Sequence, residues 1–466
     1  MIIRSFKYIY NRIIRNFDDK DFLELFSKGG LALLFRVGGQ LLGFLLTFVI
    51  AKICGADTLG DYVLAIVILK VFTLISKLGL DTGSIKYIAA YAAERRYRSI
   101  TLFRKKSVTL ITVMSVLCSF IMYFGSDYIA QFITVESDHI KITSFFVLPM
   151  SIFIFHYQNM RGLKLIGGYS FFFWMSQSLF SLIAILILTK YINVECVDAP
   201  LYAYLISLII VSILSVLVFT YFFREKFKVS EDTLINSDTD SIKDILRVSL
   251  PLMLAQAVHF IMSWTDKIML NILYSPDVTT EFTNSAQVGV YHTAFRLSMF
   301  ATIGLMAFKS IASPKFAELY KKNDIKLLKK VTQQSTKLIF WTTLPLVIIF
   351  VIFSDFLMGL FGEEFEKGVF AFIILSIGRV VVSFSGAAGN LLQMCGRQVV
   401  FMNVAIIGSI INIVLNFTLI PIYGINGSAI ATMLSLIVFN FLLVYFVKRE
   451  FGFYTFYIPF LKSNKL

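Results

Sequence analysis

An apolar stretch near the C-terminus most constrains the fold, because it is long enough to cross a membrane twice. Residues 399–420 supply about the 20 apolar residues that one helix needs to span the hydrocarbon core. Pro421 and Gly424 predict the end of that helix, since proline lacks an amide donor and glycine tolerates turn conformations. Residues 425–447 form the expected return helix. The same order of glycine, apolar run, proline-containing link and second run occurs at 167–210, so the hairpin is repeated.

Similar apolar runs recur along the whole chain. The sequence is 57% hydrophobic and 15% charged, whereas soluble domains carry about 25% charged residues. We therefore predict an all-α polytopic membrane protein with 12 transmembrane helices. The expected spans are 31–53, 60–80, 107–125, 142–160, 168–189, 201–223, 245–272, 287–312, 335–353, 369–392, 399–420 and 425–447.

The loops between these spans alternate in charge. Lysine and arginine gather after spans two, four, six, eight and twelve, and the intervening loops hold mainly aspartate and glutamate. Because Lys and Arg accumulate in cytoplasmic loops, both termini are predicted to be cytoplasmic. The formal net charge of +14 then requires no nucleic-acid partner. Residues 1–28 are basic and amphipathic, which predicts a helix lying on the lipid surface.

The two halves of the sequence match in register. Gly60 and Tyr62 correspond to Gly289 and Tyr291, and Gly167 to Gly396, each pair 229 positions apart. Parallel repeats of this kind are a transporter plan with the substrate site at the repeat interface, which predicts two parallel six-helix lobes around a central cavity. The expected segments are a cytoplasmic amphipathic segment 1–28, an N-lobe 29–223, a linker 224–244, a C-lobe 245–447 and a cytoplasmic tail 448–466.

Ionisable residues inside the apolar spans are costly and usually face a cavity or a partner. Those at depth are mainly cations, opposed by Asp266. Lys77 and Lys267 lie near span ends and are expected to reach the interface or to pair with Asp266. The other cations are expected to line a cavity suited to an anion, best a phosphate. These candidate substrate-binding residues are Arg36, Lys70, Arg296 and Arg379.

Arg36 also shares one helical face with a polar stripe, formed by Gln40, Gly43 and Thr47. Asp266, Lys267 and His259 are candidates for ion coupling or charge pairing. No protease, esterase or P-loop motif occurs, so we expect no catalytic residue, metal or cofactor. The four cysteines lack metal or redox spacing and are expected to be packing residues. The Asn412 and Asn416 pair is expected to hold neighbouring helices together.

Several motifs, in this order and spacing, resemble a known family. They lie at 55–62 (GADTLGDY), 77–80 (KLGL), 266–267 (DK), 288–291 (VGVY) and 412–432. Together they resemble the O-unit flippases, the polysaccharide-transporter branch of the multidrug/oligosaccharidyl-lipid/polysaccharide exporter superfamily.

This resemblance implies two lobes forming a V around a cavity in a bacterial cytoplasmic (inner) membrane. The implied cargo is an oligosaccharide repeat unit on undecaprenyl pyrophosphate, and a polysaccharide polymerase is an implied partner. Family members use cationic cavity residues, and Arg36, Lys70, Arg296 and Arg379 occupy comparable helices here.

Three other functions stay open at this stage. A flippase for a peptidoglycan or teichoic-type precursor would share the fold and the pyrophosphate. Drug export is less favoured, because organic cations call for acidic cavity residues and Asp266 is the acid at depth. A polytopic polysaccharide polymerase would need a substantial outer loop, yet the longest, at roughly 271–287, lacks Arg, Lys and His.

Overall fold

The computed structural model describes residues 20–226, 240–274 and 282–457, all of them in helices or their connections. Residues 1–19 of the expected surface helix at 1–28 lie outside the described residues, and residues 20–28 belong to the first helix, α2. In the first half the helices are α2 (Lys20–Ser76), α3 (Leu80–Ala93), α4 (Tyr97–Phe124), α5 (Ser126–Phe132), α6 (Ser137–Ser144), α7 (Val147–Gly162), α8 (Ile166–Ser170), η1 (Phe171–Ser176), α9 (Gln177–Ile187), η2 (Leu188–Ile192) and α10 (Ala199–Lys226).

The second half continues in the same helical style. It comprises α11 (Ile242–Leu273), α12 (Asn284–Ser298), η4 (Met299–Thr302), α13 (Ile303–Lys321), α14 (Ile325–Ile352), α15 (Ser354–Gly359), η5 (Glu363–Gly368), α16 (Val369–Ser385), α17 (Ala388–Met394) and α18 (Gln398–Phe451).

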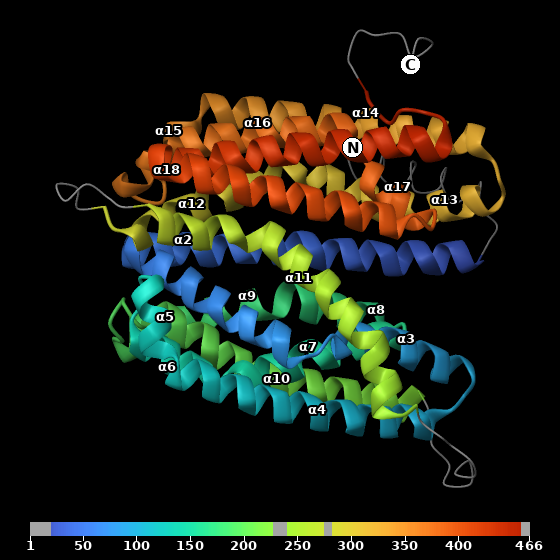
Figure 1. Cartoon of the computed structure of the whole chain (residues 1–466), viewed down its shortest axis with the longest axis horizontal. Helices are drawn as coiled ribbons and strands as arrows, with labels where there is room; N and C mark the ends of the chain where they lie inside the picture. The colour runs from blue at the N-terminus through green and yellow to red at the C-terminus, as the bar shows by residue number, and fades with distance from the viewer. Residues whose placement is uncertain (1–19, 227–239, 275–281, 458–466) are drawn as a thin grey trace, which may run out of the picture.

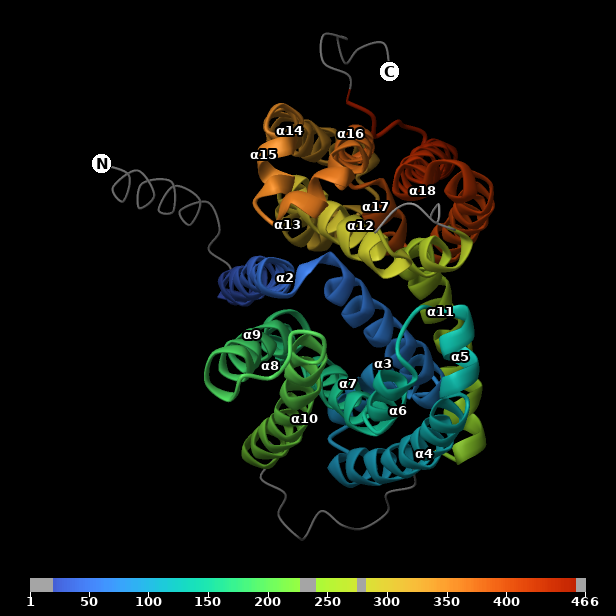
Figure 2. The same ribbon diagram turned by 90° about the vertical axis from the view of Figure 1, so that its left-hand side faces the viewer.

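Helices α3–α10 lie together on one side of the molecule and α12–α18 on the other (Figures 1 and 2). The first part of α2 runs between the two groups. Helix α11 runs obliquely from the second group to the first, and it packs against both α18 and α3. The two halves of the chain are therefore joined through α2, α11 and α12.

Eight helices of the described chain are long and apolar enough to cross a membrane, or nine if the bent pair α6 and α7 counts as one span. Two of the eight are too long for one crossing. Helix α18 has 54 residues, about 80 Å at 1.5 Å per residue against a core of about 30 Å. The multi-pass architecture is confirmed, while the count of twelve, the two-lobe division and the cytoplasmic termini stay predictions.

Helix α18 folds back on itself at Gly424, whose φ of 53° and ψ of −126° interrupt the helix. Asn412 Nδ2 donates to Ser435 Oγ at 3.2 Å across the hairpin, and Gly408 packs against the ring of Phe439. These partners lie at nearly equal distances from Gly424, as an antiparallel return requires. The predicted hairpin is therefore present, with its break at Gly424, while Pro421 stays inside the helix.

The expected cytoplasmic tail at 448–466 begins inside the last helix, and its location stays a prediction. Helix α18 continues to Phe451, and the residues after it pack back onto the second group. Phe453 is buried, the Tyr457 amide donates to Phe384 O at 3.3 Å, and Trp341 Nε1 donates to Tyr457 Oη at 3.1 Å.

Helices α2 and α12 cross in a reciprocal contact. A Cβ at Gly60 would lie 1.8 Å from Ser285 O, and a Cβ at Gly289 would lie 2.1 Å from Ala56 O. Ser285 lies 229 positions after Ala56, just as Gly289 lies 229 positions after Gly60, so the two residues of each pair occupy equivalent places in the repeat. Each half thus presents its glycine to the same backbone position of the other half, the pattern expected of a two-fold relation.

A second pair of reciprocal contacts surrounds this crossing. The Ala56 amide donates to Glu364 Oε1 at 2.6 Å, and Ser285 Oγ donates to Thr134 O at 2.9 Å. In the first half, the connection before predicted span four contacts the start of span eight. In the second half, the connection before predicted span ten contacts the start of span two. We call this region, comprising 56–61, 134–135, 283–289 and Glu364, the closed end.

Candidate functional site

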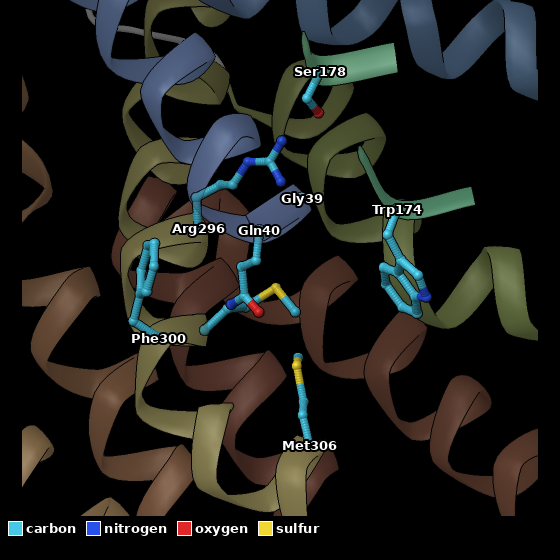
Figure 3. Close-up of a pocket in the computed structure, with 8 residues that line it drawn as sticks. Gly39, Gln40, Trp174, Ser178, Arg296, Phe300 and Met306 are labelled. Carbon is cyan, nitrogen blue, oxygen red and sulfur yellow. The ribbon is translucent and has the colours of Figure 1, made fainter. Parts of the chain in front are cut away.

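A cavity of about 140 Å³ lies between α2, η1 and α9 of the first half and α12, η4 and α13 of the second. Figure 3 shows its side chains converging from these elements, with the Arg296 guanidinium directed from α12 toward α2. The lining residues are Gly39, Gln40, Trp174, Ser178, Arg296, Met299, Phe300 and Met306. Apolar and sulfur-containing side chains thus surround a small group of polar atoms.

Arg296 projects from α12 and contacts the polar stripe of α2 that was predicted for the first span. Its Nε donates to Thr47 Oγ1 at 3.3 Å, and its Nη2 would lie 2.8 Å from a Cβ at Gly43. The absence of a side chain at Gly43 is therefore what makes room for the guanidinium. Throughout the described ranges, no ion pair within 4 Å involves Arg296, so its charge is held by neutral groups beside the cavity.

Arg36 lies next to the same cavity without lining it. Its guanidinium stacks 4.5 Å from the ring centre of Trp174, which is a lining residue. Among the residues that the structure describes, Arg36 Nε and Gln40 Nε2 are buried without hydrogen-bond partners. Because unpaired buried donors are costly, these two atoms are suited to bind an acceptor that enters the cavity.

Lys309 is a cation that the sequence interpretation overlooked. It lies in α13, close enough to Arg36 for their positive charges to repel. Its signal was the same as for the other candidates, a charged residue inside an apolar span at 287–312. Lys309 therefore belongs with the candidate site residues.

Aromatic rings lie between three of the cations, which are Lys70, Lys267 and Arg379. Lys70 Nζ lies 4.0 Å from the ring centre of Trp264 and Lys267 Nζ 4.9 Å from the same ring. Lys267 Nζ and the Arg379 guanidinium lie 4.5 Å and 5.0 Å from the ring centre of Phe295. Cation–π contacts of this kind stabilise charges that have left water.

The predicted substrate residues do not all meet at one surface. Arg379 is 9% exposed and its Nε and Nη2 both lie 3.4 Å from Ser298 Oγ. Lys70 and Lys267 interact electrostatically with Arg296. Of the four predicted residues, Arg296 lines the cavity, Arg36 lies beside it, and Lys70 and Arg379 lie in the surrounding shell.

Asp266 forms the acidic partner expected for Lys267. The two side chains are 3.7 Å apart, and both are nearly buried, at 4% and 2% exposed. Tyr291 Oη donates to Asp266 Oδ2 at 2.7 Å and lies 3.1 Å from Thr432 Oγ1. The pair is thereby fixed between α11, α12 and α18.

Lys77 pairs with an acidic residue that the sequence analysis did not single out, Asp81. Its Nζ donates to Asp81 Oδ2 at 2.9 Å, and Gln256 Nε2 of α11 donates to the other oxygen of Asp81 at 3.1 Å. Of the two alternatives expected for Lys77, reaching the interface or pairing with Asp266, the structure shows neither, because Lys77 is buried beside Asp81. Asp81 follows the break at Gly79, one helical turn after Lys77, and this contact ties α11 to α3.

The histidines lie in different surroundings. His259 is on the exposed face of α11, with its carbonyl accepting from Ser263 Oγ at 2.9 Å. His292, in contrast, is close to Arg296, Lys267 and Lys70. Across the described residues, no group of three or more His, Cys, Asp or Glu side chains could hold a metal.

Residues 26–320 match the family described as Polysaccharide biosynthesis protein, which is more than half of the chain. The chain belongs to this family. Residues 251–418 also match the MatE family. The resemblance to the polysaccharide-transporter branch that the sequence motifs indicated is therefore confirmed.

Two relatives illustrate the range of this polysaccharide biosynthesis family. A Shigella flexneri protein named as an O-antigen transporter is 21% identical, over 88% of this chain and 93% of that protein. A Haloferax volcanii protein named as a low-salt glycan biosynthesis flippase is 28% identical over 174 residues, 37% of this chain. The chain spans only about a third (35%) of that archaeal relative.

Solved structures share the fold over nearly the whole chain. The lipid II flippase MurJ in an inward closed conformation matches with a TM-score of 0.66 at 17% identity, covering 90% of this chain and 89% of that one. An inward-facing multidrug resistance transporter matches with a TM-score of 0.64 at 16% identity, covering 92% and 94%. At these identities the likeness establishes a transporter fold alone.

Proposed function

We propose that this protein is a flippase for undecaprenyl-pyrophosphate-linked oligosaccharide repeat units. It would move them from the cytoplasmic to the outer leaflet of a bacterial inner membrane, for O-antigen or another surface polysaccharide. The observation that carries the proposal is the Arg296 guanidinium, which lines a cavity between the two halves and is held there by Thr47. Relatives named as a glycan biosynthesis flippase and as an O-antigen transporter support the cargo class.

The charge balance around the cavity favours an anionic group. Lys309 is close to Arg36, which lies beside the cavity, and Lys70 and Lys267 are close to Arg296, which lines it. Arginine binds phosphate oxygens through two parallel N–H bonds, which are stronger than neutral hydrogen bonds. In this proposal Arg296 binds the diphosphate, with Arg36 and Gln40 supplying further donors.

The arrangement of the halves supports transport by alternating access. With the orientation predicted from loop charge, the closed end faces outward, so the cargo would enter from the cytoplasmic side. The polyprenyl tail would remain in lipid between the two lobes. Moving two negative charges outward across an inside-negative membrane is favourable by about 2.3 kcal/mol per charge per 100 mV, so the potential can contribute to the driving force.

Two other functions make different predictions. A flippase for a peptidoglycan or teichoic-type precursor would use the same diphosphate contacts, and one structural neighbour is a lipid II flippase. A polysaccharide polymerase would instead act on repeat units that have already reached the outer leaflet. The intermediate that accumulates without the protein distinguishes these possibilities.

The test is a deletion strain complemented with wild-type protein or with Arg296→Ala. Without the protein, single lipid-linked repeat units should accumulate on the cytoplasmic side, and wild-type protein should restore surface polymer. Arg296→Ala should insert normally and restore none. Single units at the cell surface would indicate a polymerase, and accumulated peptidoglycan precursor would indicate the other cargo.

A further inference from the structure

We propose that Cys54 and Cys196 are joined by a disulfide in the mature protein. Cys54 is the last residue before the break of α2 at Gly55, and Cys196 lies between η2 and α10. Although they are 142 positions apart in the sequence, their side chains lie close enough to interact. Cys196 Sγ also donates to Ile53 O at 3.5 Å. The expectation that these are ordinary packing residues does not account for this pairing.

The connection that carries Cys196 is fixed at several points. His139 Nε2 lies 2.7 Å from Asp198 Oδ1, which ties the connection to α6. The amides of Asp198 and Ala199 both donate to Glu195 O, at 3.2 Å and 3.0 Å, which forms a tight turn around Cys196. The contact with Cys54 is therefore made by an anchored segment.

The geometry suits a covalent bond. A disulfide needs a sulfur separation of about 2.05 Å and Cβ atoms about 3.8 Å apart. Cys196 Sγ already lies 3.5 Å from Ile53 O, the carbonyl directly before Cys54, so rotation of the two side chains can bring the sulfur atoms together. The resulting cross-link would connect the end of the first segment of α2 to the loop before α10.

The other two cysteines differ in exposure. Cys118 and Cys395 are buried, at 3% and 2% exposed, whereas Cys54 and Cys196 are both partly exposed. An oxidant can therefore reach the pair but not the buried residues. The buried cysteines also provide positions that can be changed without disturbing the proposed bond.

The redox chemistry depends on the orientation assumed under the proposed function. The connection at 193–198 is one of the acidic loops predicted to face outward, where disulfides persist. The oxidant would be the disulfide of an extracytoplasmic thiol–disulfide oxidoreductase. One cysteine thiolate attacks that disulfide to form a mixed disulfide, and the second displaces the oxidoreductase thiolate. The chain loses two electrons and two protons, and the oxidoreductase is reduced to its dithiol.

The experiment uses full-length Cys118→Ser/Cys395→Ser protein in intact cells. Free thiols are blocked with N-ethylmaleimide, the protein is denatured and reduced, and new thiols are labelled with PEG-maleimide. A mass shift of two PEG units that requires reduction is expected. Adding Cys54→Ser or Cys196→Ser should remove the shift completely. Should the double variant fail to express, mass spectrometry of non-reduced wild-type peptides reads out the same linkage.

Failure of the disulfide and failure of the orientation give different results. Thiols that are blocked by a membrane-impermeant maleimide before reduction would overturn the disulfide and leave the outward orientation standing. Thiols that react before reduction, and only with a permeant maleimide, would overturn the orientation and the disulfide together.

Discussion

At the scale of single residues, Arg296 depends on a glycine of the opposite half. The guanidinium occupies the space that a side chain at Gly43 would fill, and Thr47, one turn further along α2, accepts its Nε hydrogen. The position of the charge is therefore set by α2 as much as by α12.

Gly43→Ala should displace the guanidinium without unfolding the protein, because the end of a flexible side chain can move. We expect surface polysaccharide in a complemented deletion strain to fall severalfold, while the melting midpoint stays the same or rises, since alanine favours helix by about 1 kcal/mol over glycine. Gly38→Ala is the matched control, because its Cβ would meet Met175 Sδ at an ordinary 4.0 Å. Equal polymer levels in the two variants would contradict the positioning role.

The candidate residues were predictable from sequence to different degrees. The stripe of Gln40, Gly43 and Thr47 follows from helical spacing, but its partner Arg296 comes from the other half, and spacing within one helix carries no such information. Asp81 was missed as the partner of Lys77 because the left-handed turn at Gly79 separates them into different helices. Whether the cations bind substrate stays a prediction.

At the scale of helices, the crossing of α2 and α12 leaves no room for side chains. The atoms opposite Gly60 and Gly289 are backbone oxygens and carbons, which cannot move without moving the helices. This close approach is typical of small residues in membrane helix packing.

Gly60→Ala and Gly289→Ala should each destabilise the protein by about 1–3 kcal/mol, the usual cost of overpacking. Because the contact is reciprocal, the two variants should lower the melting midpoint of detergent-purified protein by similar amounts. Gly30→Ala is the control, since nothing lies within 4 Å of the added carbon. A wild-type midpoint for either variant would show that the crossing can separate at little cost.

The helical hairpins were predictable because length and apolar composition decide them. The exact residue at which the two helices of the α18 hairpin break was harder to predict. Proline at 421 is a standard helix-ending signal, yet the chain bends at Gly424, where the positive φ of 53° suits glycine. Pro421 is tolerated because helices in lipid can satisfy the freed carbonyl through neighbouring groups.

At the scale of the whole molecule, the closed end holds the two halves together through partly buried polar contacts. Glu364 receives the Ala56 amide hydrogen at 2.6 Å. Thr134 and Asn271 are joined in the same region by the Thr134 amide donating to Asn271 Oδ1 at 2.9 Å. Opening this end would require these bonds to break together.

Glu364→Ala should shift the population toward a state open at this end. A hydrogen bond to a charged group contributes about 1.5–3 kcal/mol, so the open fraction should rise about 10-fold or more. The readout is the rate at which an impermeant maleimide labels Gln40→Cys, in otherwise cysteine-free protein in intact cells. Glu363→Ala is the control, since Glu363 is exposed on the same short helix. An unchanged labelling rate in Glu364→Ala would show that the Glu364–Ala56 hydrogen bond does not keep the closed end shut.

The repeat itself was visible in the sequence as a constant offset between Gly60 and Gly289, Tyr62 and Tyr291. The sequence could not show that the two glycines touch, because an internal offset says nothing about which surfaces face each other. The orientation of the molecule in the membrane rests on loop charge and stays a prediction.

The reciprocal crossing also bears on symmetry. A contact in which each partner offers the same surface to the other is the contact that a dimer of identical subunits makes. The Gly60–Ser285 and Gly289–Ala56 pairs have this reciprocal form within a single chain. The cavity departs from this symmetry, because the residue 229 positions before Arg296 is Val67, so the cation lining it comes from one half alone.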